Sequence, residues 1–398
     1  MKRLNLLLVL TLALPARAAV LHRAEILPVS GEFGTAAAAL APALSLSAPS
    51  LSAGAPSLTR VPAPAAAAPK AGSALPAAAP ASAAAPVVPF SIPVEGLSAS
   101  ESLRALYASL DRSYPLPAGG LTAGVRARVR EQLDLAAGEY SEPETELLLT
   151  VARESDRALA RVQERLDRSE IDPSRAIRLS EADAPKTEEA HARIAVYPVA
   201  ADPFQWGHLL IALRAVGDLG VDKVVFVLAG DDPRKPNMTP VVSRHPMGRD
   251  VLDIFAPFFE YSPIAVGTTL DGETNIFRIL ALNPERRVDA WYMVGDDHYR
   301  LVDKKGNPDT LPKLEKHYAS AMGHSPTLHR LKVAFIKREH PAEEVPTTLE
   351  VRFLDHVGFE ASSTQVRDGR HTLMPYAAYD HARRNGGLYG VKPEGEKP

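Results

Sequence analysis

Residues 201–209, Ala-Asp-Pro-Phe-Gln-Trp-Gly-His-Leu, decide how the rest of this 398-residue sequence is interpreted. They follow an apolar run, Arg193–Val199, that is typical of a buried β-strand, and they lead into Gly207–Leu219, which has helical apolar spacing. A second polar stretch, Ala-Ser-Ser-Thr-Gln-Val-Arg at 361–367, follows another strand-like run, Leu349–Leu354. Both stretches therefore occupy the place after a strand where open α/β sheets bind ligands.

The part of the chain between these two stretches alternates between strand-like runs and helical patterns. The further strands that we expect are Lys223–Leu228, Ile264–Val266, Ala290–Val294 and Leu331–Ile336. Strands that alternate with helices indicate a parallel sheet with helices on its faces. We therefore predict an α/β fold, a Rossmann-like parallel sheet with flanking helices, over residues 190–390.

The first 95 residues have a different character. Residues 1–18 have the three parts of a secretory signal peptide in order, namely a basic start, an apolar run at Leu4–Leu14 and a small-x-small cleavage site. Residues 19–95 are rich in Ala and Pro and poor in charge, which predicts a disordered linker. We expect an exported protein, periplasmic or secreted, without membrane contact after cleavage. If residues 1–18 are only a chance hydrophobic start, the protein is cytoplasmic.

Residues 96–185 predict a small helical region between the linker and the α/β domain. Ser100 and Glu101 are suited to cap a first amphipathic helix, and a second helical pattern surrounds Val125–Leu135. The third and strongest pattern begins after Pro143. Its Arg- and Glu-rich remainder is most simply a solvated face.

Composition excludes several classes of function. The 45 Lys and Arg residues are balanced by 48 Asp and Glu residues, a net charge of −3, which argues against nucleic acid as a partner. The chain has no Cys, which excludes disulfides, Cys-ligated zinc and a thiol nucleophile.

The two polar stretches together resemble the motifs of the nucleotidylyltransferase superfamily. Its first motif is aspartate-proline-x-histidine-x-glycine-histidine, here Asp202–His208, and its last is serine-serine-threonine-x-x-arginine, here Ser362–Arg367. The likeness is closest to nicotinate- and nicotinamide-mononucleotide adenylyltransferases. Pro233-Arg-Lys235, Arg244-His-Pro-Met247 and the strand Trp291–Asp296 fit that branch.

The resemblance implies an enzyme that transfers AMP from ATP to a mononucleotide, nicotinate or nicotinamide mononucleotide, and releases pyrophosphate. Positioning and charge neutralisation do most of the work in such a transfer. The ligands implied are ATP, Mg²⁺ and a phosphorylated small-molecule acceptor, with the ion held mainly by phosphates and water. The residues implied in catalysis are His208, Gln205 and Arg367. Those implied in nucleotide or phosphate binding are Asp202, Lys235, Arg244, Gly295, Asp296, Ser362, Ser363 and Thr364.

The chain departs from the family pattern at two places. Gln205 stands where the first motif has a histidine, so a neutral amide replaces a group that can carry positive charge. Pro198 and Val199 stand in place of two glycines, which limits how closely the backbone approaches a phosphate. Two alternatives therefore stay open: a nucleotidylyltransferase with another acceptor, or an exported nucleotide-binding protein that has lost catalysis.

Overall fold

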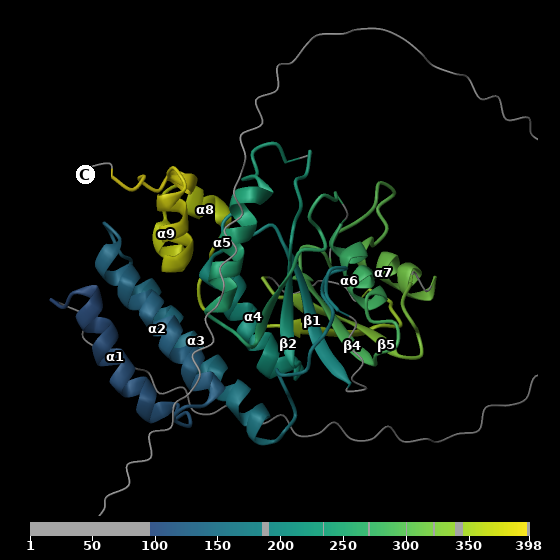
Figure 1. Cartoon of the computed structure of the whole chain (residues 1–398), viewed down its shortest axis with the longest axis horizontal. Helices are drawn as coiled ribbons and strands as arrows, with labels where there is room; N and C mark the ends of the chain where they lie inside the picture. Colours follow the sequence, from purple (N-terminus) through teal and green to yellow (C-terminus); the bar gives the residue numbers. More distant parts are fainter. Residues whose placement is uncertain are drawn as a thin grey trace, which may run out of the picture. The chain divides into compact units, whose positions relative to one another are not determined.

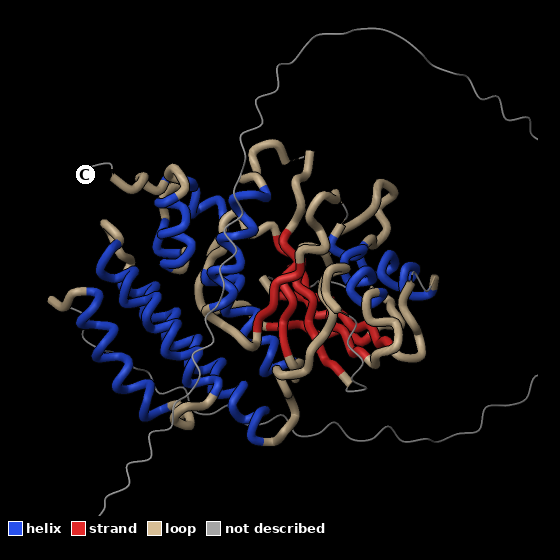
Figure 2. Tube along the Cα trace, viewed as in Figure 1, coloured by secondary structure: helices blue, strands red, loops and turns tan. Residues whose placement is uncertain are grey.

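The computed structural model describes residues 96–184, 191–233, 235–269, 271–299, 301–320, 323–338 and 345–395. The predicted signal peptide (1–18) and linker (19–95) lie outside these ranges, as do residues 185–190, where we placed the start of the α/β domain. The described residues contain a six-stranded sheet in which every neighbouring pair of strands is parallel. Its strand order is β3-β2-β1-β4-β5-β6, which confirms the predicted fold class (Figures 1 and 2).

The strands lie close to the predicted positions, with one exception. They are β1 Ala192–Val199, β2 Lys223–Leu228, β3 Phe259–Ser262, β4 Val288–Gly295, β5 His329–Ile336 and β6 Glu350–Leu354. The prediction for Ile264–Val266 is wrong, because these residues form a turn in which Val266 N–H donates to the Pro263 carbonyl at 2.9 Å. The true strand, β3, lies at the edge of the sheet and includes Glu260 and Ser262. A short edge strand of mixed polarity lacks the apolar run that identifies the others.

Helices cover both faces of the sheet (Figure 1). Side chains alternate along β1, so that Ile194 and Val196 pack with α6 (Gly272–Ala281) and α7 (Thr310–Ala319). Ala195 and Tyr197 belong to the larger core on the opposite face. That core also contains residues of α4 (Trp206–Leu219), α5 (Val241–Asp253) and α9 (Tyr376–Arg384).

Three N-terminal helices share this larger core. They are α1 Ala99–Ser113, α2 Leu121–Glu139 and α3 Thr145–Asp167. The first is capped two residues earlier than we expected, since Ser98 is its N-cap and forms a reciprocal capping box with Glu101.

The position of α3 explains the unusual composition of α4. Eleven of the 14 residues of α4 are buried, on all sides of the helix. A helix that is apolar all round must be covered all round. The sheet covers one side of α4, and α3 lies along another, with the Arg165 Nε donating to the Gly217 carbonyl at 2.9 Å (Figure 2). The N-terminal helices are therefore built into the same core as the helix that follows the first motif.

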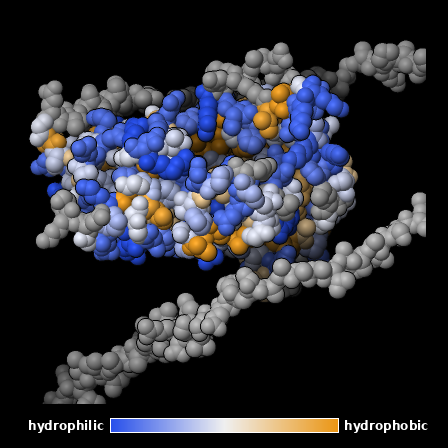
Figure 3. All heavy atoms as spheres, turned by 90° about the horizontal axis from the view of Figure 1, so that it is seen from above, coloured by the Kyte–Doolittle hydropathy of each residue, from blue (hydrophilic) through white to orange (hydrophobic). Residues whose placement is uncertain are grey.

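Polar residues dominate the face of the molecule that Figure 3 shows, with apolar side chains in small patches. Within the ranges that the structure describes, no helix has both the length and the apolar character needed to cross a membrane.

Because α3 packs in the same core as the α/β domain, we predict that shortening a buried side chain of α3 strongly lowers the free energy of unfolding. Leu159 is fully buried, and Leu159→Ala should lower the free energy of unfolding by about 2–5 kcal/mol. Leu121 is 48% exposed at the start of α2, so Leu121→Ala should cost less than about 0.5 kcal/mol. Urea denaturation of both variants measures the difference. Small and equal losses of unfolding free energy in the two variants would mean that α3 does not share a core with the α/β domain.

Candidate active site

The two motifs meet at the carboxyl edge of the sheet. The hydroxyl of Ser363 donates to the Pro203 carbonyl at 2.9 Å, and Nη1 of Arg367 donates to the Asp202 carbonyl at 2.5 Å. The short helix α8 (Ser363–Arg367) is thereby docked on the loop that joins β1 to α4. The loop itself is tightly folded, since Ala201 has the left-handed φ of +47° that few non-glycine residues adopt.

Gln205 makes a third link between the motifs. It is the N-cap residue of α4 and only 5% exposed, and its Nε2 donates to the Ala361 carbonyl at 2.9 Å. Its Oε1 is buried and lies 3.1 Å from where a Cβ on Gly207 would stand. We expected Gln205 to contact a nucleotide phosphate. The structure instead directs its amide into the protein, where it joins the first motif to the last.

The hydroxyls of α8 are also used within the protein. The hydroxyl oxygen of Ser362 caps the helix by accepting from Gln365 N–H at 3.2 Å. In return, Oε1 of Gln365 accepts from Ser362 N–H at 3.0 Å. Thr364 accepts from Nη2 of Arg367 at 3.1 Å. Ser362–Thr364 therefore shape α8 and hold it against the first motif in this structure. Arg367 is 41% exposed at its side chain, which leaves part of its guanidinium open to a ligand.

His208 lies in the first turn of α4, packed edge-on against the rings of Tyr197 and Phe204. Its Nδ1 is buried without a hydrogen-bond partner. Burial, with a smaller contribution from the charge of Arg338, lowers the pKa of His208 to about 4. The imidazole is therefore neutral at pH 7 and has one N–H to donate, and Nε2 is the nitrogen that a ligand can meet.

Arg338 is a site residue that our sequence analysis missed. It lies two residues beyond β5, where its backbone N–H donates to Oδ2 of Asp296 at 2.9 Å. Its charge reaches both His208 and Tyr197, since it lowers the pKa of His208 and opposes the rise in the pKa of Tyr197 that burial causes. The signal was present in the sequence, because Arg338 follows a predicted strand just as both motifs do.

The strand β4, which lies beside β1, ends at Gly295, and Asp296 is the first residue after it. Asp296 is buried and its carboxylate accepts from Arg338 N–H, so it orders the end of β5. The next residue, Asp297, is exposed, and its Oδ1 lies 2.2 Å from where a Cβ on Gly295 would stand. Asp297 also helps to raise the pKa of Tyr197, which places its charge at the same edge as His208.

Arg244 does not have the place that we expected. It is fully buried, and its guanidinium donates to the carbonyls of Ala200 (2.8 Å), Ala229 (2.7 Å) and Thr239 (3.1 Å). These carbonyls belong to the ends of β1 and β2 and to the loop before α5. Arg244 therefore braces three loops of the site and is not available as a phosphate contact. A buried guanidinium can be retained only when its donors are bonded in this way.

Asp202 and Lys235 differ in whether their side chains are available to a ligand. Asp202 is 6% exposed, and its carboxylate accepts from Thr239 N–H at 3.2 Å, so it too holds the loop before α5. Lys235 is exposed on that loop, and only backbone bonds are found for it in the described part of the chain. Of the two residues, Lys235 is the one that could reach a ligand.

A metal site made of protein groups alone is absent from the described ranges, since no cluster there holds three or more His, Cys, Asp or Glu residues. Among the carboxylates at this edge, Asp202 and Asp296 are bonded to backbone N–H groups, and Asp297 is exposed. This donor set fits a magnesium ion that keeps most of its ligands from phosphate and water.

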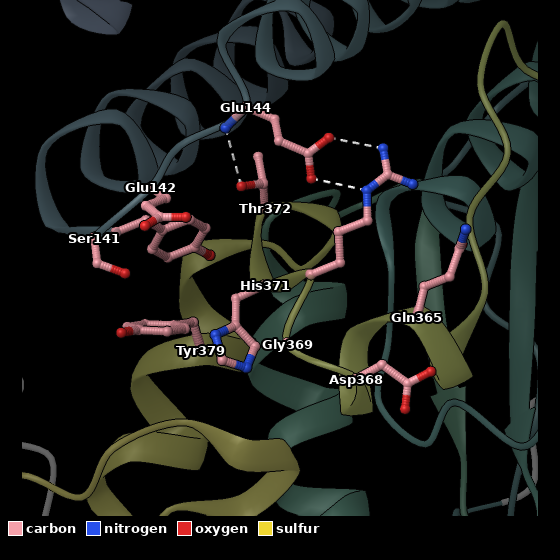
Figure 4. Close-up of a pocket in the computed structure, with 11 residues that line it drawn as sticks. Ser141, Glu142, Glu144, Gln365, Asp368, Gly369, His371, Thr372 and Tyr379 are labelled. Carbon is pink, nitrogen blue, oxygen red and sulfur yellow. Dashed lines mark hydrogen bonds and ion pairs between the residues drawn. The ribbon is translucent and has the colours of Figure 1, made fainter.

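Two cavities in the described part of the chain do not have His208 in their walls. One, of about 470 Å³, lies between the α2–α3 junction and the segment that follows α8, with Tyr140, Glu144, Asp368 and Arg370 in its walls (Figure 4). Another, of about 590 Å³, borders the edge strand β3 and α5, with Arg249 and Tyr261 in its walls. The first of these cavities borders α8, the helix that carries the last motif.

Comparison with known proteins gives a partial match. No family model matches the chain. Proteins from two strains of Thermus thermophilus, each named a probable nicotinate-nucleotide adenylyltransferase, are 29% identical over 180 residues, which cover 44% of this chain and 84% of theirs. Among solved structures, two of the Plasmodium falciparum nicotinic acid mononucleotide adenylyltransferase, complexed with APC or with NaAD, match at 11% identity. They cover 51% of this chain and 99% of theirs, with TM-scores of 0.35 and 0.37.

The bracing role of Arg244 predicts a loss of stability that an exposed cation would not cause. Arg244→Met removes the guanidinium donor from the carbonyls of Ala200, Ala229 and Thr239, and each carbonyl that is left unpaired away from water costs about 1–3 kcal/mol. We expect thermal unfolding at a markedly lower temperature. Lys235→Met, the same change at an exposed position of the neighbouring loop, should leave the melting temperature within a degree or two. Equal melting temperatures would contradict the bracing role.

The low pKa of His208 predicts a pH dependence of stability. A free histidine has a pKa of about 6.5, so between that pH and about 4 the unfolded chain binds a proton at residue 208 that the folded chain does not. This contribution to stability is complete above pH 6.5 and declines as the pH falls. His208→Gln should therefore flatten the loss of unfolding free energy between pH 7 and pH 5, measured by urea titration. An unchanged slope would mean that His208 titrates normally.

Proposed function

Taking the distant homology of this chain to nicotinate-nucleotide adenylyltransferases as its premise, we propose that the protein transfers AMP from ATP to nicotinate or nicotinamide mononucleotide. An oxygen of the acceptor phosphate attacks the α-phosphorus of ATP, the bond from that phosphorus to the β-phosphate oxygen breaks, and pyrophosphate leaves. No general base is needed, because the attacking oxygen is already ionised. Export through residues 1–18 is part of the proposal.

The observation that supports this function best is the docking of α8 on the loop before His208. Ser363 and Arg367 bond to the carbonyls of Pro203 and Asp202, which brings the last motif to the first without a ligand. Donors held in place before a reaction lower its barrier, because they need no reorganisation when charge develops.

His208, Arg338 and Arg367 are the groups that we assign to the phosphates. The neutral His208 would donate one hydrogen bond, and an approaching phosphate anion would raise its pKa and favour the charged form. Arg338 would bring a permanent positive charge to the edge where Gln205 brings none. Mg²⁺, when bound with ATP, would neutralise phosphate charge, and Asp297 is an exposed carboxylate that would be available to hold it.

A second candidate function is nucleotide binding without catalysis. It is favoured by one specific observation: the neutral amide of Gln205 is only 5% exposed and uses one of its two N–H donors on the Ala361 carbonyl, which leaves at most one for a phosphate. Pro198, which stands in place of a family glycine, adds to this because it limits how closely the backbone can approach a phosphate. Loss of one preorganised donor typically lowers a rate about 10²- to 10³-fold.

Pyrophosphate release separates these functions. With ATP, Mg²⁺ and nicotinate or nicotinamide mononucleotide, we expect slow turnover that His208→Ala and Arg367→Ala each reduce at least about 10²-fold. His191→Ala is the matched control, because His191 lies at the amino end of β1, on the opposite edge of the sheet, and should change the rate little. Robust turnover that survives His208→Ala would contradict the proposed site. ATP binding without pyrophosphate release by any variant would favour the second function.

A further inference from the structure

The segment that follows the last motif is hydrogen-bonded to residues of the N-terminal helical region. Both Oε atoms of Glu144 accept from the guanidinium of Arg370, at 2.8 and 2.7 Å, and Glu144 N–H donates to the hydroxyl of Thr372 at 3.2 Å (Figure 4). The buried hydroxyl of Tyr140 donates to the Met374 carbonyl at 3.1 Å. We call these bonds the clamp. They join the α2–α3 junction to residues 370–374, more than 220 positions away in the sequence.

A second contact from the same helices begins where the clamp ends. Gln132, on α2, accepts from Ala377 N–H at 2.7 Å, in the first turn of α9, where the N-cap residue Pro375 provides no side-chain cap. The chain from Arg370 to Ala377 is thus bonded at four separate points to α2 and to the α2–α3 junction.

The helix α8 needs such support because it is short. Five residues are too few for a helix to be stable without tertiary contacts. Arg370 lies three residues after Arg367, across a turn in which Gly369 has a φ of +102°. Movement of Arg370 would therefore pass directly to the end of α8 that carries Arg367. On its other side, α8 is held by the bonds of Ser363 and Arg367 to the first motif.

We infer that Glu144 is a positioning residue for the reaction, through which the N-terminal helices hold Arg367 and Ser363 in place at the first motif. The kinetic part of this inference rests on the proposed adenylyl transfer. The structural part, that Glu144 orders α8, stands without it. In this inference Glu144 acts through its bonds to Arg370 and Thr372.

Glu144→Gln tests the inference with a close control. The change keeps the side-chain volume and removes the charge that binds both guanidinium nitrogens. Glu146→Gln makes the same change two residues later, in the same first turn of α3, where the side chain is exposed and forms no bond found in the described chain. Any general effect of a lost negative charge at the start of α3 is therefore common to both variants.

We expect Glu144→Gln to lower kcat for pyrophosphate release about 5- to 10-fold with little change in KM for ATP, and Glu146→Gln to leave both unchanged. Both variants should have the wild-type melting temperature within about two degrees. Glu144→Arg should lower kcat further through repulsion of Arg370, and the double variant Glu144→Arg, Arg370→Glu should recover most of it. A purely structural role would lower the melting temperature and leave kcat intact.

Hydrogen exchange provides a readout that is independent of activity. Backbone amides of residues 362–370 should exchange at least about 5-fold faster in Glu144→Arg than in wild type or Glu146→Gln, and the double variant should restore protection. Equal exchange in all four proteins, or a kcat unaffected in Glu144→Arg, overturns the inference. If the wild type releases no pyrophosphate, the proposed function fails, and the exchange rates alone decide the role of Glu144.

Discussion

The docking of a five-residue helix on a loop is the interaction on which the rest of the site depends. Ser363 and Arg367 donate hydrogen bonds to the carbonyls of Pro203 and Asp202. In the opposite direction, Gln205 donates to the Ala361 carbonyl. The strands that precede these segments are not neighbours, since β4 and β5 lie between β1 and β6. The two motifs therefore meet through loops that cross the edge of the sheet, and side-chain bonds to backbone must fix their separation.

The same constraint explains why so many polar residues of the motifs face the protein. Arg244, Asp202 and Asp296 are buried and bond to backbone groups of neighbouring loops. Rigid loops keep His208, Arg338 and Arg367 at one edge of the sheet. The conversion of ionisable residues into braces costs desolvation, which complete hydrogen bonding offsets.

Much of the fold could be predicted from the sequence, because buried parallel strands are continuous apolar runs, as in Lys223–Leu228. The edge strand β3 could not, since one of its sides is unpaired and its composition is mixed. At the site, the residue types indicated which segments meet, but not which way each side chain turns. Gln205 and Arg244 look like ligand contacts in the sequence, and only the positions of the Ala361, Ala200 and Ala229 carbonyls give them another role.

The helix α4, apolar on every side, also has a consequence for synthesis of the chain. Its cover, α3, ends at Asp167 and leaves the ribosome first, while α4 is complete only at Leu219, about 50 residues and several seconds of translation later. During that interval the apolar face of α3 has no partner from the α/β core. The order of the elements thus leaves the apolar face of the nascent α3 uncovered by the α/β core until the helix of the first motif emerges to meet it.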